Sequence, residues 1–261
     1  MSADLIQALK AARQGPAPAT GKPRSLLIAG ATGVLGNEVM RRMVGLQQFA
    51  STRVLAREPI TPALRSVTAL VVQGGGIGGW PQAPADTGII MFDPPRLYYD
   101  RERALWTPEP AQLVEVAQWM RSCGVQTLAI VLPHAQGQLP EALKRGLASL
   151  DEHAVVALGF ERVLIVRSAR KPAQDASGAG LFQKTAAWML SIGSLMVPGS
   201  EQPVRASKVA EVVSEALQAM PPGIHIAAPE LVWRAAQGSV RDVIRSWLHP
   251  ETAQSTAKSG P

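Results

Sequence analysis

Three glycines within a seven-residue segment form the pattern in this sequence that is best suited to chemistry. The segment comprises Gly30, Ala31, Thr32, Gly33, Val34, Leu35 and Gly36, and it follows the apolar run Ser25–Ala29 directly. Apolar residues at helical spacing come next, so the glycines lie where a strand passes into a helix. Unpaired N–H groups and the helix dipole favour a phosphate at such a position, and a side chain at the tight turn would block its approach.

The position of the three glycines along the chain distinguishes this segment from an ordinary glycine-rich turn between a strand and a helix. Gly36 has the spacing that lets a helix pack closely on the preceding strand in dinucleotide-binding units. An ordinary turn is the alternative interpretation, but here a strand precedes the glycines, a helix follows them, and the segment opens the first strand–helix unit of an α/β pattern. We therefore predict that the segment binds the pyrophosphate of a dinucleotide cofactor.

The choice between the two nicotinamide cofactors depends on a residue about 20 positions beyond the glycine turn. There the sequence has Arg57 followed by Glu58, at the end of a second apolar run. A guanidinium matches a 2′-phosphate in charge and geometry, whereas a carboxylate would bind the free ribose hydroxyls of NAD. We therefore expect NADP. In the NAD alternative, Arg57 is a solvated charge and Glu58 contacts the ribose.

Short apolar runs that could position these residues alternate with helical patterns along the chain. The runs are continuous rather than alternating, which indicates strands buried on both faces of a parallel sheet. The expected strands are Ser25–Ala29, Thr52–Arg57, Val67–Val72, Thr87–Phe92, Thr127–Leu132 and Arg162–Val166. Helical patterns follow Thr107, run along Leu143–Leu158 as one long helix, and recur at Val209–Ala216 and Val240–Trp247, with Thr107 and Ser239 as expected caps. The alternation predicts an α/β fold with a doubly wound, mostly parallel sheet.

Composition agrees with one globular domain and excludes several classes of protein. The 261 residues are 46% hydrophobic and 18% charged, and the net charge of +6 is scattered, which makes nucleic acid an unfavourable partner. We expect an N-terminal extension and linker over residues 1–23, one domain over 24–249, and a disordered tail over 250–261. The single Cys123 excludes an intrachain disulfide and a cysteine-based zinc site, and we expect no metal. No apolar stretch is long enough to span a membrane and no secretory signal is present, so we expect a cytoplasmic protein.

The chain resembles the atypical and extended branch of the short-chain dehydrogenase/reductase superfamily, with its NmrA-like and epimerase-like members. The resemblance rests on GATGVLG at Gly30–Gly36, VLAR at Val54–Arg57, RVLIVR at Arg162–Arg167 and PVRASKVAEVV at Pro203–Val213. It implies a Rossmann sheet with a small C-terminal lobe on the substrate side. It also implies a cofactor at the carboxyl ends of the strands, walled by residues that include Asp93, Pro94, Leu132 and Pro133.

The departures from that family concern its catalytic residues. Such enzymes carry a Ser or Thr after the fifth strand and a Tyr-x-x-x-Lys in the next helix, where the tyrosine exchanges the substrate proton. Here the fifth strand is followed by His134, and Lys144 stands near the tyrosine position. His134 could act as an acid or base and Lys144 as a donor, although a loop histidine and a solvated lysine are the simpler interpretations.

Two functions therefore remain open at the level of the sequence. One is an NADP-dependent oxidoreductase or isomerase that acts on a small carbonyl or hydroxyl compound with a non-standard site. The other is a non-catalytic NADP(H)-binding sensor or interaction protein, which explains the glycine turn together with the missing Ser, Tyr and Lys. A homodimer through the Leu143–Leu158 stripe is a further alternative, but packing of that stripe against the sheet explains it more simply.

Overall fold

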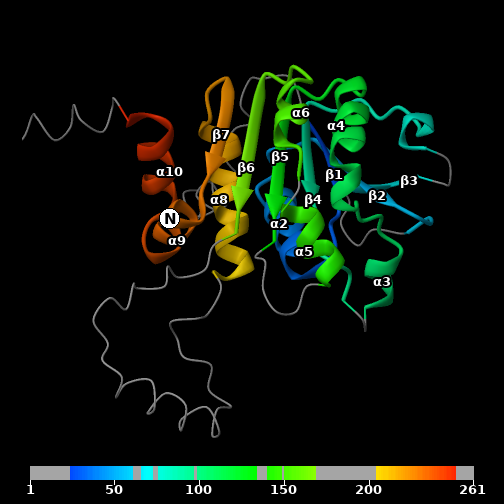
Figure 1. Cartoon of the computed structure of the whole chain (residues 1–261), viewed down its shortest axis with the longest axis horizontal. Helices are drawn as coiled ribbons and strands as arrows, with labels where there is room; N and C mark the ends of the chain where they lie inside the picture. Colours follow the sequence, from blue (N-terminus) through cyan, green and yellow to red (C-terminus); the bar gives the residue numbers. More distant parts are fainter. Residues whose placement is uncertain are drawn as a thin grey trace, which may run out of the picture.

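A seven-stranded parallel sheet forms the centre of the molecule, with helices on both faces (Figure 1). The computed structural model describes residues 24–60, 66–72, 76–96, 99–133, 140–148, 150–168 and 204–250. The strands are β1 (Ser25–Ala29), β2 (Ser51–Ala56), β3 (Val67–Val71), β4 (Thr87–Met91), β5 (Thr127–Leu132), β6 (Arg162–Arg167) and β7 (Gly223–Ala227). Their order is β3-β2-β1-β4-β5-β6-β7, and every neighbouring pair is parallel. The predicted fold class is confirmed.

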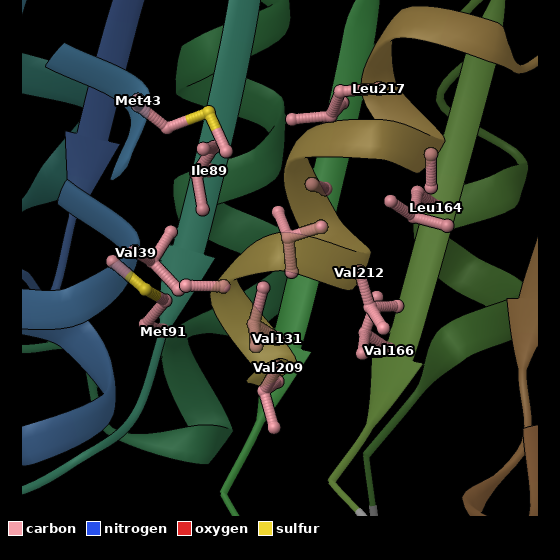
Figure 2. Packing of buried hydrophobic residues seen from close by; sticks show 14 of the residues in the cluster. Val39, Met43, Ile89, Met91, Val131, Leu164, Val166, Val209, Val212 and Leu217 are labelled. Atoms are coloured by element: carbon pink, nitrogen blue, oxygen red, sulfur yellow. The ribbon is translucent and has the colours of Figure 1, made fainter. Parts of the chain in front are cut away.

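Helices cover the two faces of this sheet in separate layers. The helices are α2 (Gly33–Gly45), α3 (Asp100–Arg103), α4 (Leu113–Ser122), α5 (Glu141–Ala148), α6 (Glu152–Val156), α8 (Ala206–Ala219), α9 (Pro229–Gln237) and α10 (Val240–Leu248), with short 3-10 turns at Ile77–Gly79 and Pro110–Gln112. One core cluster joins α2, α8, α9 and α10 to the sheet, and the other joins α4 and α6 to its opposite face. Figure 2 shows Val39 of α2 with Val209 and Val212 of α8 against β4, β5 and β6.

The six predicted strands all form, and each of their ends lies within one residue of the expected position. The sequence analysis missed β7 and α9. Because β7 is an edge strand with Ile224 and Ile226 exposed, it lacks the continuous burial that identified the other strands. The last helix begins as expected, with the Ser239 hydroxyl accepting a hydrogen bond from the Asp242 N–H.

Two helix predictions were wrong. The stripe from Leu143 to Leu158 is two helices, α5 and α6, because Asp151 accepts a hydrogen bond from the Ala154 N–H and begins a new helix. Thr107 does not cap the helix before β5; Glu109 and Gln112 form a capping box at a 3-10 turn, and α4 follows from Leu113.

Candidate functional site

The glycine segment lies where the order of the parallel sheet reverses. β1 lies between β2 and β4, so the connections that leave the carboxyl ends of β1 and β4 diverge to opposite faces of the sheet. A crevice for ligands is typical of this point in doubly wound folds. The loop from β1 to α2 is therefore placed as the sequence analysis expected.

The backbone conformation or the close packing excludes a side chain at each of the three glycines. Gly30 and Gly33 have φ of +78° and +67°, in the left-handed region that favours glycine. A Cβ on Gly33 would overlap the Asp93 carboxylate, and one on Gly36 would lie 2.6 Å from the Gly30 carbonyl oxygen. The backbone thus makes the close approaches of a phosphate-binding turn, and α2 begins directly against the end of β1.

The N–H groups that such a turn offers to a phosphate are bound by carboxylates of this chain. The N–H of Gly33 donates to Oε2 of Glu102 at 3.0 Å, and the N–H of Leu35 donates to Oδ2 of Asp93 at 2.9 Å. Thr32 is the N-cap residue of α2, but its side chain does not cap the helix. Its hydroxyl instead donates to the Asp93 carbonyl oxygen at 2.5 Å and lies 2.9 Å from the Thr107 hydroxyl. Carboxylates at a helix N-terminus satisfy the same donors and dipole that bind phosphate elsewhere.

Glu102 is the centre of this arrangement. Its side chain is 5% exposed, and Asn37 donates to its Oε1 at 2.8 Å. Arg96 donates to the same carboxylate through its backbone N–H at 2.9 Å, through Nε at 2.7 Å and through Nη2. Burial by itself would raise the pKa of Glu102. The hydrogen bonds from Arg96 and from the N–H of Gly33 together outweigh burial, so this pKa lies below its usual value of 4.5.

The second carboxylate, Asp93, has the opposite shift. Burial raises the pKa of Asp93 above its usual value, and the charge of Glu102 raises it further. The backbone N–H groups of Leu35 and Val34 and the charge of Arg96 act against this but do not cancel it. Asp93 and Glu102 thus both bind N–H groups of the glycine turn, but the pKa of Asp93 is raised and that of Glu102 is lowered.

Glu102 belongs to residues Tyr99–Thr107, which lie against the carboxyl ends of β1 and β2. We call these residues the covering segment. The Arg57 N–H donates to the Ala104 carbonyl at 2.7 Å, and the Trp106 N–H donates to the Leu55 carbonyl at 3.0 Å. These two bonds flank an antiparallel bridge between Ala56 and Leu105. Figure 1 shows α3, part of this segment, beyond the carboxyl end of β2.

The covering segment also reaches the first strand. The Trp106 carbonyl accepts a hydrogen bond from the Gly30 N–H at 3.1 Å, and the Trp106 ring packs edge to face on Trp80 with the ring centroids 4.8 Å apart. The carboxyl ends of β1 and β2 are where the adenosine half of a dinucleotide lies in folds of this type. In this conformation the backbone N–H groups of Gly30, Gly33 and Leu35 are all hydrogen-bonded to other parts of the chain.

The remaining site residues predicted from the sequence are placed as follows. Arg57 is exposed directly after β2, and Pro94 follows Asp93 in the loop after β4. Leu132 is the last residue of β5, and Pro133 follows it. Lys144 lies on α5, but its side chain is outside the described residues, as is His134. These assignments remain predictions.

Asn37, Arg96 and Glu102 were missed by the sequence analysis. Asn37 lies one helical turn beyond Gly33, whose carbonyl accepts a hydrogen bond from its Nδ2 at 2.9 Å. That spacing is the one signal that could have been found in advance. Arg96 and Glu102 carry no motif, since only the fold of the loop after β4 brings them to the glycine turn.

Across the described parts of the chain, no group of three or more His, Cys, Asp or Glu side chains is arranged to hold a metal ion. No helix among the described residues has the length and apolar character needed to cross a membrane.

No protein-family model matches the chain, and no curated protein matches it. Among solved structures, the chain is similar to the Citrobacter sp. triphenylmethane reductase complexed with NADP(H), at 17% identity and a TM-score of 0.45 over 77% of this chain and 68% of that one. It is similar to the Bordetella bronchiseptica enzyme WbmF in complex with NAD+, at 10% identity and a TM-score of 0.47 over 90% and 94% of the two chains. A short-chain dehydrogenase family protein from Francisella tularensis matches at 11% identity and a TM-score of 0.40, over 78% and 97%.

At these identities the likeness concerns the fold alone. The strand order, the parallel pairing and the glycine turn at the point of reversal are present in this chain independently of any comparison. The chain is thus an α/β protein with a Rossmann-like fold, in which helices flank a seven-stranded parallel sheet.

Proposed function

We propose that this protein binds NADP(H) as a non-catalytic sensor or interaction protein. The observation that carries the proposal is the combination of a formed glycine turn at the β1–α2 junction with the lack of a proton-donating tyrosine beyond β5. The sequence holds two tyrosines, Tyr98 and Tyr99, and both precede β5. Residues four positions after them are Glu102 and Arg103, so neither begins a Tyr-x-x-x-Lys pair.

The choice of NADP(H) over NAD(H) is supported by the position of Arg57. Arg57 is exposed directly beyond the carboxyl end of β2, where the adenosine ribose lies in folds of this type. The residue is exposed, and its backbone N–H donates a hydrogen bond to the Ala104 carbonyl of the covering segment. A 2′-phosphate at this position would gain a charge-assisted contact that NAD(H) cannot make.

An oxidoreductase with a non-standard site is the second candidate function. It is favoured by the same fold, and it would require His134 or Lys144 to exchange a proton with a small carbonyl or hydroxyl substrate. Neither side chain belongs to the described residues. The first candidate needs no such group, and for that reason we prefer it.

Titration of NADPH and NADH against the wild type, Arg57→Ala and Arg41→Ala tests the proposal. We expect the wild type to prefer NADPH and Arg57→Ala to lose that preference. Arg41 is a matched control, because it is an exposed arginine on α2 that pairs with Glu38. Equal binding of both cofactors by the wild type would contradict the choice of NADP(H), and no binding of either would contradict the proposal as a whole.

A turnover assay separates the two candidate functions. We expect no oxidation of NADPH above the rate without protein across a panel of small aldehydes and ketones. Oxidation that requires the protein, and that His134→Ala or Lys144→Ala abolishes, would replace the first candidate with the second.

A further inference from the structure

We infer that the covering segment, Tyr99–Thr107, excludes the dinucleotide from its own site, with the carboxylate of Glu102 in the position of a cofactor phosphate. The inference rests on the proposed function, because it concerns the same crevice. It goes beyond that function because it identifies a segment of the same chain that competes with the cofactor for the site.

The contacts of Glu102 are those of a bound anion. Its carboxylate accepts from the first backbone N–H of α2, from a backbone N–H after β4, from an amide side chain and from a guanidinium. Each of these donors could equally serve a phosphate oxygen. If the covering segment moved away, Gly33, Asn37 and Arg96 would lose the carboxylate to which they donate. A cofactor phosphate could then accept hydrogen bonds from the same donors.

The backbone of the covering segment holds Glu102 in place. The segment adds a short antiparallel bridge beside β2 and caps the end of β1 through the Trp106 carbonyl. These bonds lie over the strand ends where the adenosine half would bind, so the phosphate position and the adenosine position are covered together. The apparent affinity for a dinucleotide is then reduced by the fraction of molecules in which the segment has left.

The bridge between Ala56 and Leu105 offers a covalent test. Its flanking hydrogen bonds run from Arg57 to Ala104 and from Trp106 to Leu55, so the two residues form a non-hydrogen-bonded antiparallel pair. The Cα atoms of such pairs are roughly 4.5 Å apart, which suits a disulfide. Ala56→Cys combined with Leu105→Cys would therefore lock the segment when oxidised and release it when reduced. The native Cys123 is buried elsewhere and does not compete.

The measurement is the affinity for NADPH of the oxidised and reduced forms of this double variant. Each form is the control for the other, and circular dichroism verifies that both are folded. We expect the oxidised form to bind about tenfold more weakly or worse, because the locked segment cannot leave. Equal affinities of the two forms would overturn the inference and leave the proposed function intact.

A second pair of variants tests the role of the carboxylate. Glu102→Gln removes the charge that holds the segment, and we expect it to bind NADPH about tenfold more tightly than the wild type. Asp100→Asn is the matched control, since Asp100 lies in the same segment and its side chain is 94% exposed; we expect no change. Binding by Glu102→Gln alone, with none by the wild type, would support the inference and contradict the proposed function.

Two further outcomes complete the test. If no form binds NADPH, including the reduced double variant and Glu102→Gln, both the inference and the proposed function are overturned. Amide exchange of the apo wild type gives a measurement without ligand: the N–H groups of Gly33 and Trp106 should be protected, and fast exchange at both would overturn the inference whatever the titrations show.

Discussion

The backbone N–H of Gly33 donates a hydrogen bond to the carboxylate of Glu102, a residue 69 positions later in the chain. This bond joins the start of α2 to the covering segment and gives the helix N-terminus an anionic partner. The donors of a turn satisfied in this way are paired and the helix dipole is compensated without a bound anion.

Glu102→Gln should destabilise the protein. The substitution keeps the size of the buried side chain but removes the ion pair with Arg96. It also replaces one acceptor oxygen with an NH2 group, although both oxygens accept hydrogen bonds in the wild type. We expect a loss of about 2 kcal/mol in the free energy of unfolding at neutral pH. Urea unfolding measures it, and Asp100→Asn should change it by less than about 0.5 kcal/mol. Equal effects of the two substitutions would show that Glu102 is not held as the structure describes.

The stabilising contribution of Glu102 should depend on pH. Its pKa in the folded protein lies below the usual 4.5, so the folded state favours the charged form. The contribution is therefore complete above about pH 4.5 and is lost as the pH falls through the folded pKa. The difference in unfolding free energy between wild type and Glu102→Gln should shrink below that pH. A difference that stays constant down to pH 3 would contradict the assigned charge state.

Asp93→Asn should have the opposite pH dependence and should improve cofactor binding. The pKa of Asp93 is raised above 3.8, so its charge opposes folding increasingly as the pH rises from 3.8 through the folded pKa. The Asn variant removes that charge, while its amide oxygen can still accept from the Leu35 N–H. We expect unchanged or higher stability at neutral pH, and NADPH binding tighter by about tenfold, because a negative charge beside the phosphate position is gone.

Unfolding and titration experiments at neutral pH would check the Asp93→Asn prediction, again with Asp100→Asn as the control for loss of one negative charge. Weaker NADPH binding by Asp93→Asn would mean that the Asp93 carboxylate supports the cofactor rather than repelling it.

Gly36→Ala should destabilise the junction of β1 and α2. An added Cβ would lie 2.6 Å from the Gly30 carbonyl oxygen and 2.9 Å from the backbone of Ala31, and neither neighbour is the flexible end of a side chain. We expect a loss of about 1–3 kcal/mol in the free energy of unfolding. Gly45 ends the same helix with nothing within 4 Å of an added Cβ, so Gly45→Ala should be neutral or slightly stabilising. Thermal and urea unfolding of the pair would measure the contrast.

The sequence by itself determined the sheet and the glycine turn. Continuous apolar runs such as Thr127–Leu132 predict strands buried on both faces, and the glycines at 30, 33 and 36 mark a turn that tolerates no side chain. Both signals are local, since they depend on a run of consecutive apolar residues or on the backbone angles and close contacts within one turn. β7 escaped prediction because an exposed edge strand lacks the first of these signals.

Only the tertiary structure decided what faces the glycine turn. Glu102 and Arg96 have no distinguishing pattern in the sequence, and their role arises because the loop after β4 folds back over the ends of β1 and β2. Asp93 could be placed at the end of β4 from the sequence, but not its carboxylate against the N–H of Leu35. Contacts between residues tens of positions apart depend on the path of a loop, and no periodicity in the chain encodes that path.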